Sequence, residues 1–218
     1  MDGRLLAFAR NDDGGVSTTA QTVPGGDFDR WQDLGGGPGV QDGVSASTDP
    51  EGRVEVFAFA VEAGFGVLKR WRRTEPGAAL RLDPDFTALE PAGPPTATGG
   101  HVVYRLADGN ASKIGHTWRT RSGAWVSEVV EGHGGVGPIA AAGNVLYATN
   151  RGGVSAARLG EWAWTDLGGL VVHRPAVVVD PSGRTHALAL SADGELTHWY
   201  PLGGPGRRRP GRRSGRTL

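Results

Sequence analysis

The sequence predicts an all-β protein, a β-propeller of about five four-stranded blades whose first and last blades are incomplete. One observation behind this prediction is a repeated element, Trp-x-x-Leu-Gly-Gly, at residues 31–36 and again at 164–169. The copies are 133 positions apart, close to three periods of about 44, and such a period is typical of solenoids and propellers. In addition, 37 glycines and 14 prolines punctuate short apolar runs, as expected for short strands joined by tight turns.

A further observation is a strand signal that recurs five times, each copy entered through a glycine. The copies begin at Gly3, Gly52, Gly100, Gly143 and Gly183, at steps of 49, 48, 43 and 40 residues. These steps match the spacing of about 40–50 residues between four-stranded propeller blades. We therefore divide the chain into five units, numbered in chain order.

The second unit shows the plan of one blade most completely. We expect its strands at residues 44–47, 54–60, 67–73 and 86–89. Asp49-Pro-Glu-Gly52 joins the first two, because proline at the second position and glycine at the fourth are typical of a β-turn. The loop 74–85 is longer than its counterparts, and we expect it to protrude.

The other units follow this plan, with departures at the two ends. We expect strands at 101–106, 112–119 and 125–130 with an Asp108-Gly109 hairpin turn, at 139–142, 144–149, 154–159 and 162–167, and at 176–179, 185–190 and 195–200. The first unit begins at what is the second strand elsewhere, and the fifth lacks a fourth strand. Either a ring closes around a three-stranded blade, or the chain is a truncated or frame-altered copy of a longer propeller. We favour the second, which would leave open blade edges for self-association.

The end of the chain differs in composition from the rest. We expect residues 1–204 to form the propeller and residues 205–218, rich in Arg, Gly and Pro, to be disordered. Residues 203–218 contain six arginines and no acid, whereas residues 1–202 contain 17 basic and 23 acidic residues. No aromatic residue accompanies the arginines, so we expect at most non-specific attraction of anions and no specific nucleic-acid partner.

Several other classes of site find no support in the sequence. There is no cysteine, which excludes disulfides and thiolate metal ligands. The six histidines form no close His-x-His or His-x-x-x-His pair, and we expect no metal site and no cofactor. The start of the chain does not read as a signal peptide, and no apolar run approaches the roughly 20 residues of a membrane span. As written, we expect the chain to stay in the cytoplasm.

Four segments resemble a known family of sugar-binding propellers. They are Phe28-Asp-Arg-Trp-Gln-Asp-Leu-Gly-Gly36, Ser122-Gly-Ala-Trp125, Trp164-Thr-Asp-Leu-Gly-Gly169 and Asp193-Gly-Glu-Leu-Thr-His-Trp199. Together they are similar to the tectonin and Photorhabdus-type lectin β-propellers, including the small five-bladed tachylectin type. The resemblance implies glycan partners, namely fucosylated, methylated or N-acetylated sugars bound between neighbouring blades, and related lectins can act outside the cell. Residues 129–132 and 18–20 depart from the pattern.

Candidate site residues follow from the chemistry of sugar recognition, in which an aromatic face packs on the C–H side of the ring and fixed polar groups bind hydroxyls. We predict carbohydrate binding by three third-strand tryptophans, Trp71, Trp118 and Trp199, with their neighbours Arg70, His116 and His198. The alternative interpretation is structural: a tryptophan that recurs at one position per blade often packs between blades, and its polar neighbours can simply face solvent.

The function predicted from these observations is a non-catalytic, lectin-like propeller with shallow, multivalent sugar sites between blades. We expect no catalytic residue and no enzyme activity. One alternative is a protein-interaction propeller with degenerate sugar sites, suggested by the irregular third unit and the loop 74–85. Another is a propeller glycoside hydrolase, but its candidate carboxylates occupy unrelated repeat positions: Glu55, Glu62, Glu128, Asp166 and Glu195.

Overall fold

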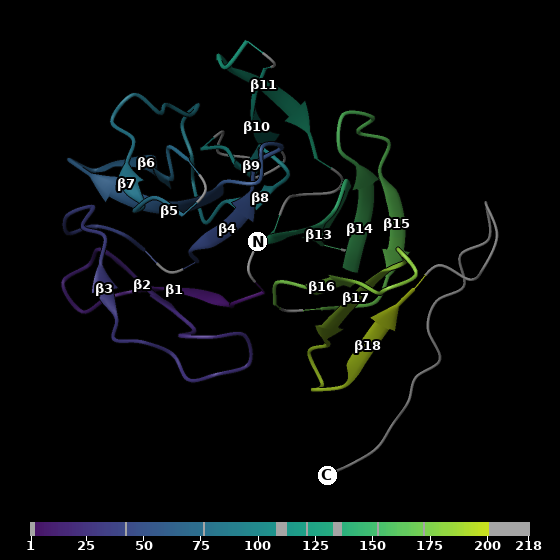
Figure 1. Cartoon of the computed structure of the whole chain (residues 1–218). Coiled ribbons are helices and arrows are strands. Elements are labelled where there is room, and N and C mark those ends of the chain that lie inside the picture. Colours follow the sequence, from purple (N-terminus) through teal and green to yellow (C-terminus); the bar gives the residue numbers. More distant parts are fainter. Residues whose placement is uncertain are drawn as a thin grey trace. The chain divides into compact units, whose positions relative to one another are not determined.

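The computed structural model describes residues 3–41, 43–75, 77–107, 113–120, 122–132, 137–151, 153–171 and 173–200. Within these residues the regular secondary structure consists of strands, without a helix (Figure 1). The chain divides into two compact units, Met1–Ala107 with Gly115–Glu128, and Asp108–Ile114 with Val129–Leu218. The predicted tail, 205–218, and the Asp108-Gly109 turn lie outside the described residues.

The first unit contains two blades and most of a third. Blade 1 has the strand order β1 (Leu6–Arg10), β2 (Val16–Ala20), β3 (Gln32–Asp33). Blade 2 consists of β4 (Ser45–Thr48), β5 (Val54–Glu62), β6 (Phe65–Arg72) and β7 (Arg81–Leu82). Blade 3 consists of β8 (Thr96–Thr98), β9 (His101–Arg105), β10 (Lys113–Arg119) and β11 (Trp125–Glu131). Each strand lies beside the next one in the chain, which is the arrangement of a meander.

The second unit contains the last two blades, built in the same way. Blade 4 consists of β12 (Ile139–Ala142), β13 (Val145–Asn150), β14 (Gly153–Arg158) and β15 (Thr165–Gly168). Blade 5 has three strands, β16 (Ala176–Val179), β17 (Thr185–Leu190) and β18 (Leu196–Trp199). The prediction of about five four-stranded blades with incomplete first and last blades is confirmed, but the first strand of blade 3, Thr96–Thr98, was not predicted.

Two predicted fourth strands are misplaced. In blade 2 the fourth strand is Arg81–Leu82 instead of 86–89, so part of the expected loop 74–85 pairs with β6. Phe86 follows the Asp83-Pro84-Asp85 turn and is buried against Phe57, with ring centroids 5.5 Å apart. In blade 4 the strand begins at Thr165 and not at 162, because Trp162 has a positive φ of 53° that interrupts an extended chain.

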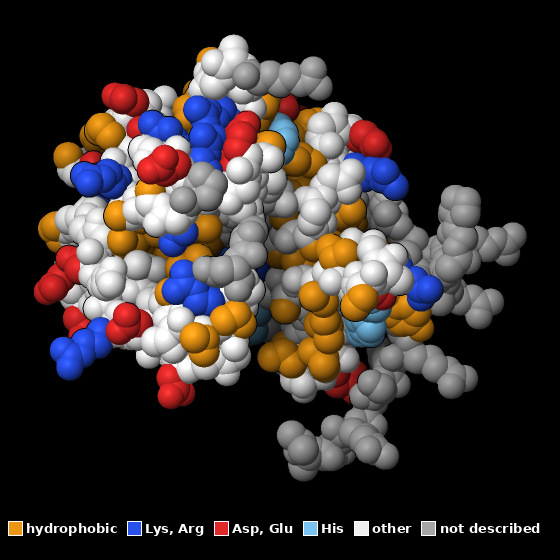
Figure 2. Space-filling model, in the orientation of Figure 1, with side chains coloured by type: hydrophobic (Ala, Val, Ile, Leu, Met, Phe, Trp, Pro, Cys, Tyr) orange, Lys and Arg blue, Asp and Glu red, His pale blue; other side chains and the backbone are white. Residues whose placement is uncertain are grey.

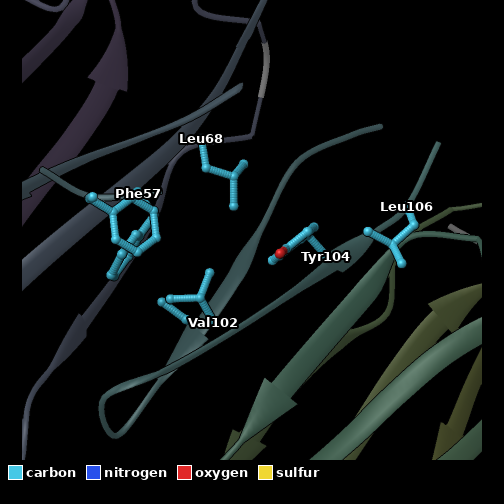
Figure 3. Packing of buried hydrophobic residues seen from close by; sticks show 7 residues of the cluster. Phe57, Leu68, Val102, Tyr104 and Leu106 are labelled. Atoms are coloured by element: carbon cyan, nitrogen blue, oxygen red, sulfur yellow. The ribbon is translucent and has the colours of Figure 1, made fainter. Parts of the chain in front are cut away.

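The hydrophobic core consists of three clusters, each shared by two neighbouring blades of one unit. Between blades 2 and 3, Phe57 and Leu68 face Val102, Tyr104 and Leu106 of the next blade (Figure 3). The cluster between blades 1 and 2 consists of Val16, Val40, Val56, Ala58, Ala60 and Trp71. The cluster between blades 4 and 5 consists of Tyr147, Val154, Ala156, Val171, Ala187, Ala189 and Trp199. Apolar residues at alternate positions of central strands therefore form the packing between blades.

The repeated Leu-Gly-Gly element has a defined role in this packing. Between blades 1 and 2, the indole Nε1 of Trp71 donates to the carbonyl of Leu34 over 3.0 Å. Gly36 has a φ of 105°, and a Cβ there would lie 2.5 Å from Cζ2 of the Trp71 ring. Glycine is required because the backbone passes directly against the indole.

Blades 4 and 5 repeat the same joint. Nε1 of Trp199 donates to the carbonyl of Leu167 over 3.2 Å, and a Cβ on Gly169 would lie 2.8 Å from Cζ2 of Trp199. In both places the Leu-Gly-Gly segment of one blade binds the third-strand tryptophan of the next. The repeated motif is thus a connection between blades.

Candidate functional site

Trp71 and Trp199, two of the predicted sugar-binding residues, lie in these joints. Trp71 is fully buried and Trp199 is 5% exposed, and each indole N–H is already hydrogen-bonded to a carbonyl. Trp118 lies elsewhere: it is half-buried and stacks on His116, with ring centroids 4.6 Å apart. The three tryptophans therefore do not form one kind of position, although the sequence suggested that they do.

Arg70 is buried within blade 2, does not face solvent and lines neither of the two pockets described below. Its guanidinium forms ion pairs with Glu55 and Asp83, both of which are also buried. The guanidinium carbon lies 4.7 Å from the ring centroid of Trp125, a cation–π distance. Glu55, a carboxylate considered for a hydrolase, is thereby held in a structural ion pair.

His116 belongs to a hydrogen-bonded chain across blade 3. Its Nε2 lies 2.9 Å from Nδ1 of His101, and its Nδ1 lies 2.9 Å from Oε1 of Glu128. Burial lowers the pKa of both His101 and His116 below the ordinary value for histidine. Both rings are therefore neutral near pH 7, and His116 is occupied by its neighbours in the blade.

His198 belongs to a similar chain in blade 5. Its Nε2 lies 3.0 Å from Nδ1 of His186, whose Nε2 lies 3.1 Å from Oδ2 of Asp180. The ring of Tyr200 packs on His198 with centroids 4.9 Å apart. Burial, with a smaller contribution from His186, lowers the pKa of His198. Hydrogen bonds from Ser182, the Arg184 backbone and His186 hold the pKa of Asp180 well below its usual range.

A pocket of about 620 Å³ lies between blades 4 and 5, and we call it the blade-4/5 pocket. Its aromatic lining consists of Tyr147, Tyr200 and the edge of Trp199. Its polar lining consists of Asn144, Arg158, Thr165, Asp166, Arg184 and Thr185. Tyr200 is 38% exposed, and Asp166 accepts a hydrogen bond from the backbone of Gly168. Aromatic surface and hydrogen-bonding groups of both charges thus meet in one concave site.

A second pocket, of about 440 Å³, lies between blades 1 and 2, and we call it the blade-1/2 pocket. Its polar lining consists of Thr18, Thr19, Asp29, Arg30, Gln32, Asp33 and Arg73. The remainder is aliphatic or glycine: Leu6, Ala20, Leu34, Gly77, Ala78, Ala79 and Leu80. No aromatic residue lines it. Both pockets lie beside the Leu-Gly-Gly strand of one blade and the end of the third strand of the next.

Of the six predicted site residues, Trp199 alone lines one of these two pockets. The sequence interpretation missed Tyr147, Tyr200, Arg158 and Arg184. A signal for Tyr200 and Arg184 was present, since Tyr200 follows the repeated tryptophan and Arg184 follows the repeated turn glycine. Tyr147 ends the fourth copy of the repeated strand signal, as Tyr104 ends the third, and nothing comparable pointed to Arg158.

Neither a metal site nor a membrane span emerges from the described residues. In the described ranges, no three His, Asp or Glu side chains are arranged to hold a metal ion. A search of the same residues for a helix long and apolar enough to cross a membrane also found none.

Comparison with solved structures identifies the architecture. The six-bladed fucose-binding lectin of the fungus Aleuria aurantia superimposes with a TM-score of 0.61 at 14% identity, covering 95% of this chain and 74% of the lectin. The fold is that of a β-propeller. AofleA from Arthrobotrys oligospora gives a TM-score of 0.62 at 10% identity, with 93% of this chain and 66% of that chain covered.

Similar structures also include propellers with other descriptions. A protein from Bacteroides uniformis, provisionally described as a 6-phosphogluconolactonase, gives a TM-score of 0.56 at 12% identity, covering 97% of this chain and 81% of that chain. No protein-family model matches the sequence, and no curated protein is significantly similar to it. At these identities the likeness establishes the fold and leaves the function to the geometry of the site.

Proposed function

We propose that this protein is a non-catalytic, carbohydrate-binding β-propeller and that its sugar site is the blade-4/5 pocket. The observation that carries the proposal is the combination of Tyr147 and Tyr200 with Arg158, Arg184 and Asp166 in one pocket. An aromatic side chain supplies the face for the C–H side of a sugar, and arginine and carboxylate groups bind its hydroxyls.

Two features support a binding function over a catalytic one. The carboxylates considered for hydrolysis do not meet in the blade-4/5 pocket, where Asp166 is the one acidic lining residue. Glycoside hydrolysis ordinarily needs two carboxyl groups across the scissile bond. The titratable residues Asp180, His186 and His198 form a hydrogen-bonded chain within blade 5, and the ring of His198 packs on Tyr200. These groups therefore hold the Tyr200 ring in place and are engaged with one another.

The ligand class follows from the pocket and from the propellers that this chain resembles. One similar structure is the fucose-binding lectin of Aleuria aurantia. We propose a neutral sugar of the fucosylated, methylated or N-acetylated kind, as the tectonin-like segments of the sequence also imply. A methyl or deoxy group provides apolar surface for Tyr200. Binding at one open pocket should be weak, so useful strength would come from several sites acting together.

A glycan-array screen followed by calorimetry on the selected sugar tests this proposal. Tyr200→Ala and Arg184→Ala should each reduce affinity about tenfold or more, because each removes an aromatic or charged contact. Phe65→Ala and Arg81→Ala are matched controls, since both side chains are exposed and line neither pocket. Retention of full affinity in both pocket variants would overturn the site.

A second function, protein interaction, is favoured by one surface. Hydrophobic side chains gather on the face of blade 5, over β16–β18 (Figure 2). They include Val178, Leu190 and Leu196, which share one face of the sheet and are 45% to 54% exposed. Exposed apolar patches on soluble proteins often mark contact sites, including self-association through blade 5. Leu196→Lys should then abolish a concentration-dependent increase in mass measured by light scattering, and an unchanged monomer at all concentrations would exclude self-association.

A further inference from the structure

The blade-1/2 pocket has its own chemistry, which the proposed neutral-sugar site does not explain. Most of its polar side chains are used within the protein. Thr18 donates to the carbonyl of Ala7 over 3.1 Å, and Thr19 donates to the carbonyl of Asp29 over 2.7 Å.

The two carboxylates of the pocket also have structural partners. Oδ1 of Asp33 accepts hydrogen bonds from Asn11 and from the backbone of Gly35, each over 2.9 Å. Oδ1 of Asp29 accepts from the backbone N–H of Arg30 over 2.7 Å. These contacts fix the strand β3 and its turn, and both acids are used within blade 1.

Three lining side chains remain without a hydrogen bond or ion pair to any described residue: Arg30, Gln32 and Arg73. Arg73 is half-buried, and its Nε is buried without a partner in the protein. The protein thus leaves the guanidinium of Arg73 without a hydrogen-bond partner among the described residues, and its terminal N–H groups are the donors that a ligand in the pocket could use. Arg30 is exposed at the same pocket and adds a second guanidinium.

We propose that the blade-1/2 pocket binds a sugar that carries a carboxylate, such as a uronate or a sialate, with Arg73 and Arg30 as donors to the acid group. The planar guanidinium fork matches a planar carboxylate with two parallel hydrogen bonds. Gln32 is available to the sugar hydroxyls. The proposal extends the proposed function, since it takes the propeller to be a sugar-binding protein with a second, different site.

Charge and surface in the pocket favour a carboxylate sugar over other ligands. Asp29 and Asp33 already accept hydrogen bonds within the protein, whereas the side chains of Arg30 and Arg73 have none to the described residues, so the two guanidinium groups are the ones left to balance an acid group. The lining contains no aromatic side chain, which removes the usual platform for a neutral sugar. A volume of about 440 Å³ is in the range of small-ligand pockets.

Calorimetry on the full chain tests the assignment, with the methyl glycosides of galacturonate, glucuronate and N-acetylneuraminate as probes. At least one should bind, and its methyl ester or the matched neutral glycoside should bind at least about tenfold more weakly. Arg73→Gln should weaken binding of the acid by about tenfold or more. Arg73→Lys should also weaken it, because lysine keeps the charge but not the fork.

Controls separate this proposal from a general loss of folding and from the proposed function. Arg73→Gln removes no hydrogen bond within the described protein, so its melting temperature should match the wild type, and Arg81→Gln provides a surface control. Tyr200→Ala should weaken the neutral sugar and leave the acidic sugar unchanged. No binding of any acid probe, equal binding of acid and ester, or equal binding by Arg73→Gln would each overturn the acidic-sugar site while leaving the blade-4/5 site intact.

Discussion

Blades 2 and 5 are built on the same skeleton. In each, an Asp-Pro-x-Gly-Arg turn joins the first two strands, and the aspartate N–H donates to the arginine carbonyl over 2.9 Å at Asp49 and 2.8 Å at Asp180. Each has a third-strand tryptophan facing the equivalent residue of the second strand, with Trp71 beside Val56 and Trp199 beside Ala187. Each tryptophan binds the Leu-Gly-Gly segment of the preceding blade.

The two blades differ at one polar position beside that tryptophan. In blade 2 the pair is Glu55 and Arg70, buried ions that also engage Asp83. In blade 5 the equivalent residues are His186 and His198, which are only half-buried and lie next to the exposed Tyr200. The repeat therefore carries the joints between blades, whereas residues outside the repeat give each blade its own chemistry.

Truncating the shared tryptophans is expected to have the largest effect, and a similar one in both blades. Trp71→Ala and Trp199→Ala should each lower the free energy of unfolding by about 3–5 kcal/mol, since each leaves a large cavity and an unpaired carbonyl. Chemical denaturation measures both. Trp118→Ala should cost clearly less because this side chain is half-buried. A small effect at position 71 or 199 would mean that the joint is not what holds the blades together.

These tryptophans also show what the sequence could and could not predict. The period of the Trp-x-x-Leu-Gly-Gly element correctly predicted blades, because the joint recurs wherever two such blades pack. Grouping Trp118 with Trp71 and Trp199 was misleading. Trp118 stands two residues after His116, whereas Trp71 and Trp199 directly follow Arg70 and His198, and a shift of one residue in a strand moves a side chain to the opposite face. In β10 the residue that directly follows His116 is Thr117, which is fully buried.

The pockets were beyond the reach of the sequence for a related reason. Tyr147 and Tyr200 come from blades 4 and 5, and only the packing of the two blades brings them to one pocket. Arg30 and Arg73 likewise meet across blades 1 and 2. Period and motif predict which strands pack together, but a pocket depends on side chains that do not repeat.

The difference between the polar pairs predicts unequal sensitivity to loss of one partner. Glu55→Gln should destabilise by about 3–5 kcal/mol, because it removes a charge that balances buried Arg70. His186→Gln should cost about 1 kcal/mol or less, because both its side chain and that of Asp180 are partly exposed. Urea denaturation of both variants gives the comparison. Equal losses would show that the two blades use this position alike.

The glycine that faces each tryptophan gives a finer comparison. Gly36→Ala should lower the free energy of unfolding by about 1–3 kcal/mol more than Gly35→Ala does. Both glycines have a positive φ, but only the Cβ added at position 36 would contact the indole of Trp71. At the second joint, Gly169→Ala should also lose more stability than Gly168→Ala, but by a smaller margin. The added Cβ would lie 2.8 Å from Cζ2 of Trp199, instead of 2.5 Å from Cζ2 of Trp71. Melting temperatures of the four variants test this order, and a reversed order would contradict the joint geometry.

The smallest expected effect is a dependence of stability on pH that comes from the histidine pair of blade 5. The pKa of His198 is lowered in the folded state, so the unfolded chain binds more protons as the pH falls below about 6.5. This contribution to stability is therefore complete above that pH and is lost as the pH falls toward the folded pKa. Asp180 stays ionised throughout this window because its pKa is strongly lowered.

The measurement is the drop in melting temperature between pH 7.5 and pH 5.5. His198→Gln should reduce this drop by a few degrees. In a protein of this size, a change of 1 kcal/mol in the free energy of unfolding shifts the melting temperature by roughly 2–4 °C. Part of the drop should remain, because His101 and His116 of blade 3 have lowered pKa values too. His173→Gln is the control, since His173 is exposed. If His198→Gln and His173→Gln retain the same drop, the histidine pair of blade 5 contributes no acid sensitivity, and its difference from the ion pair of blade 2 is one of packing alone.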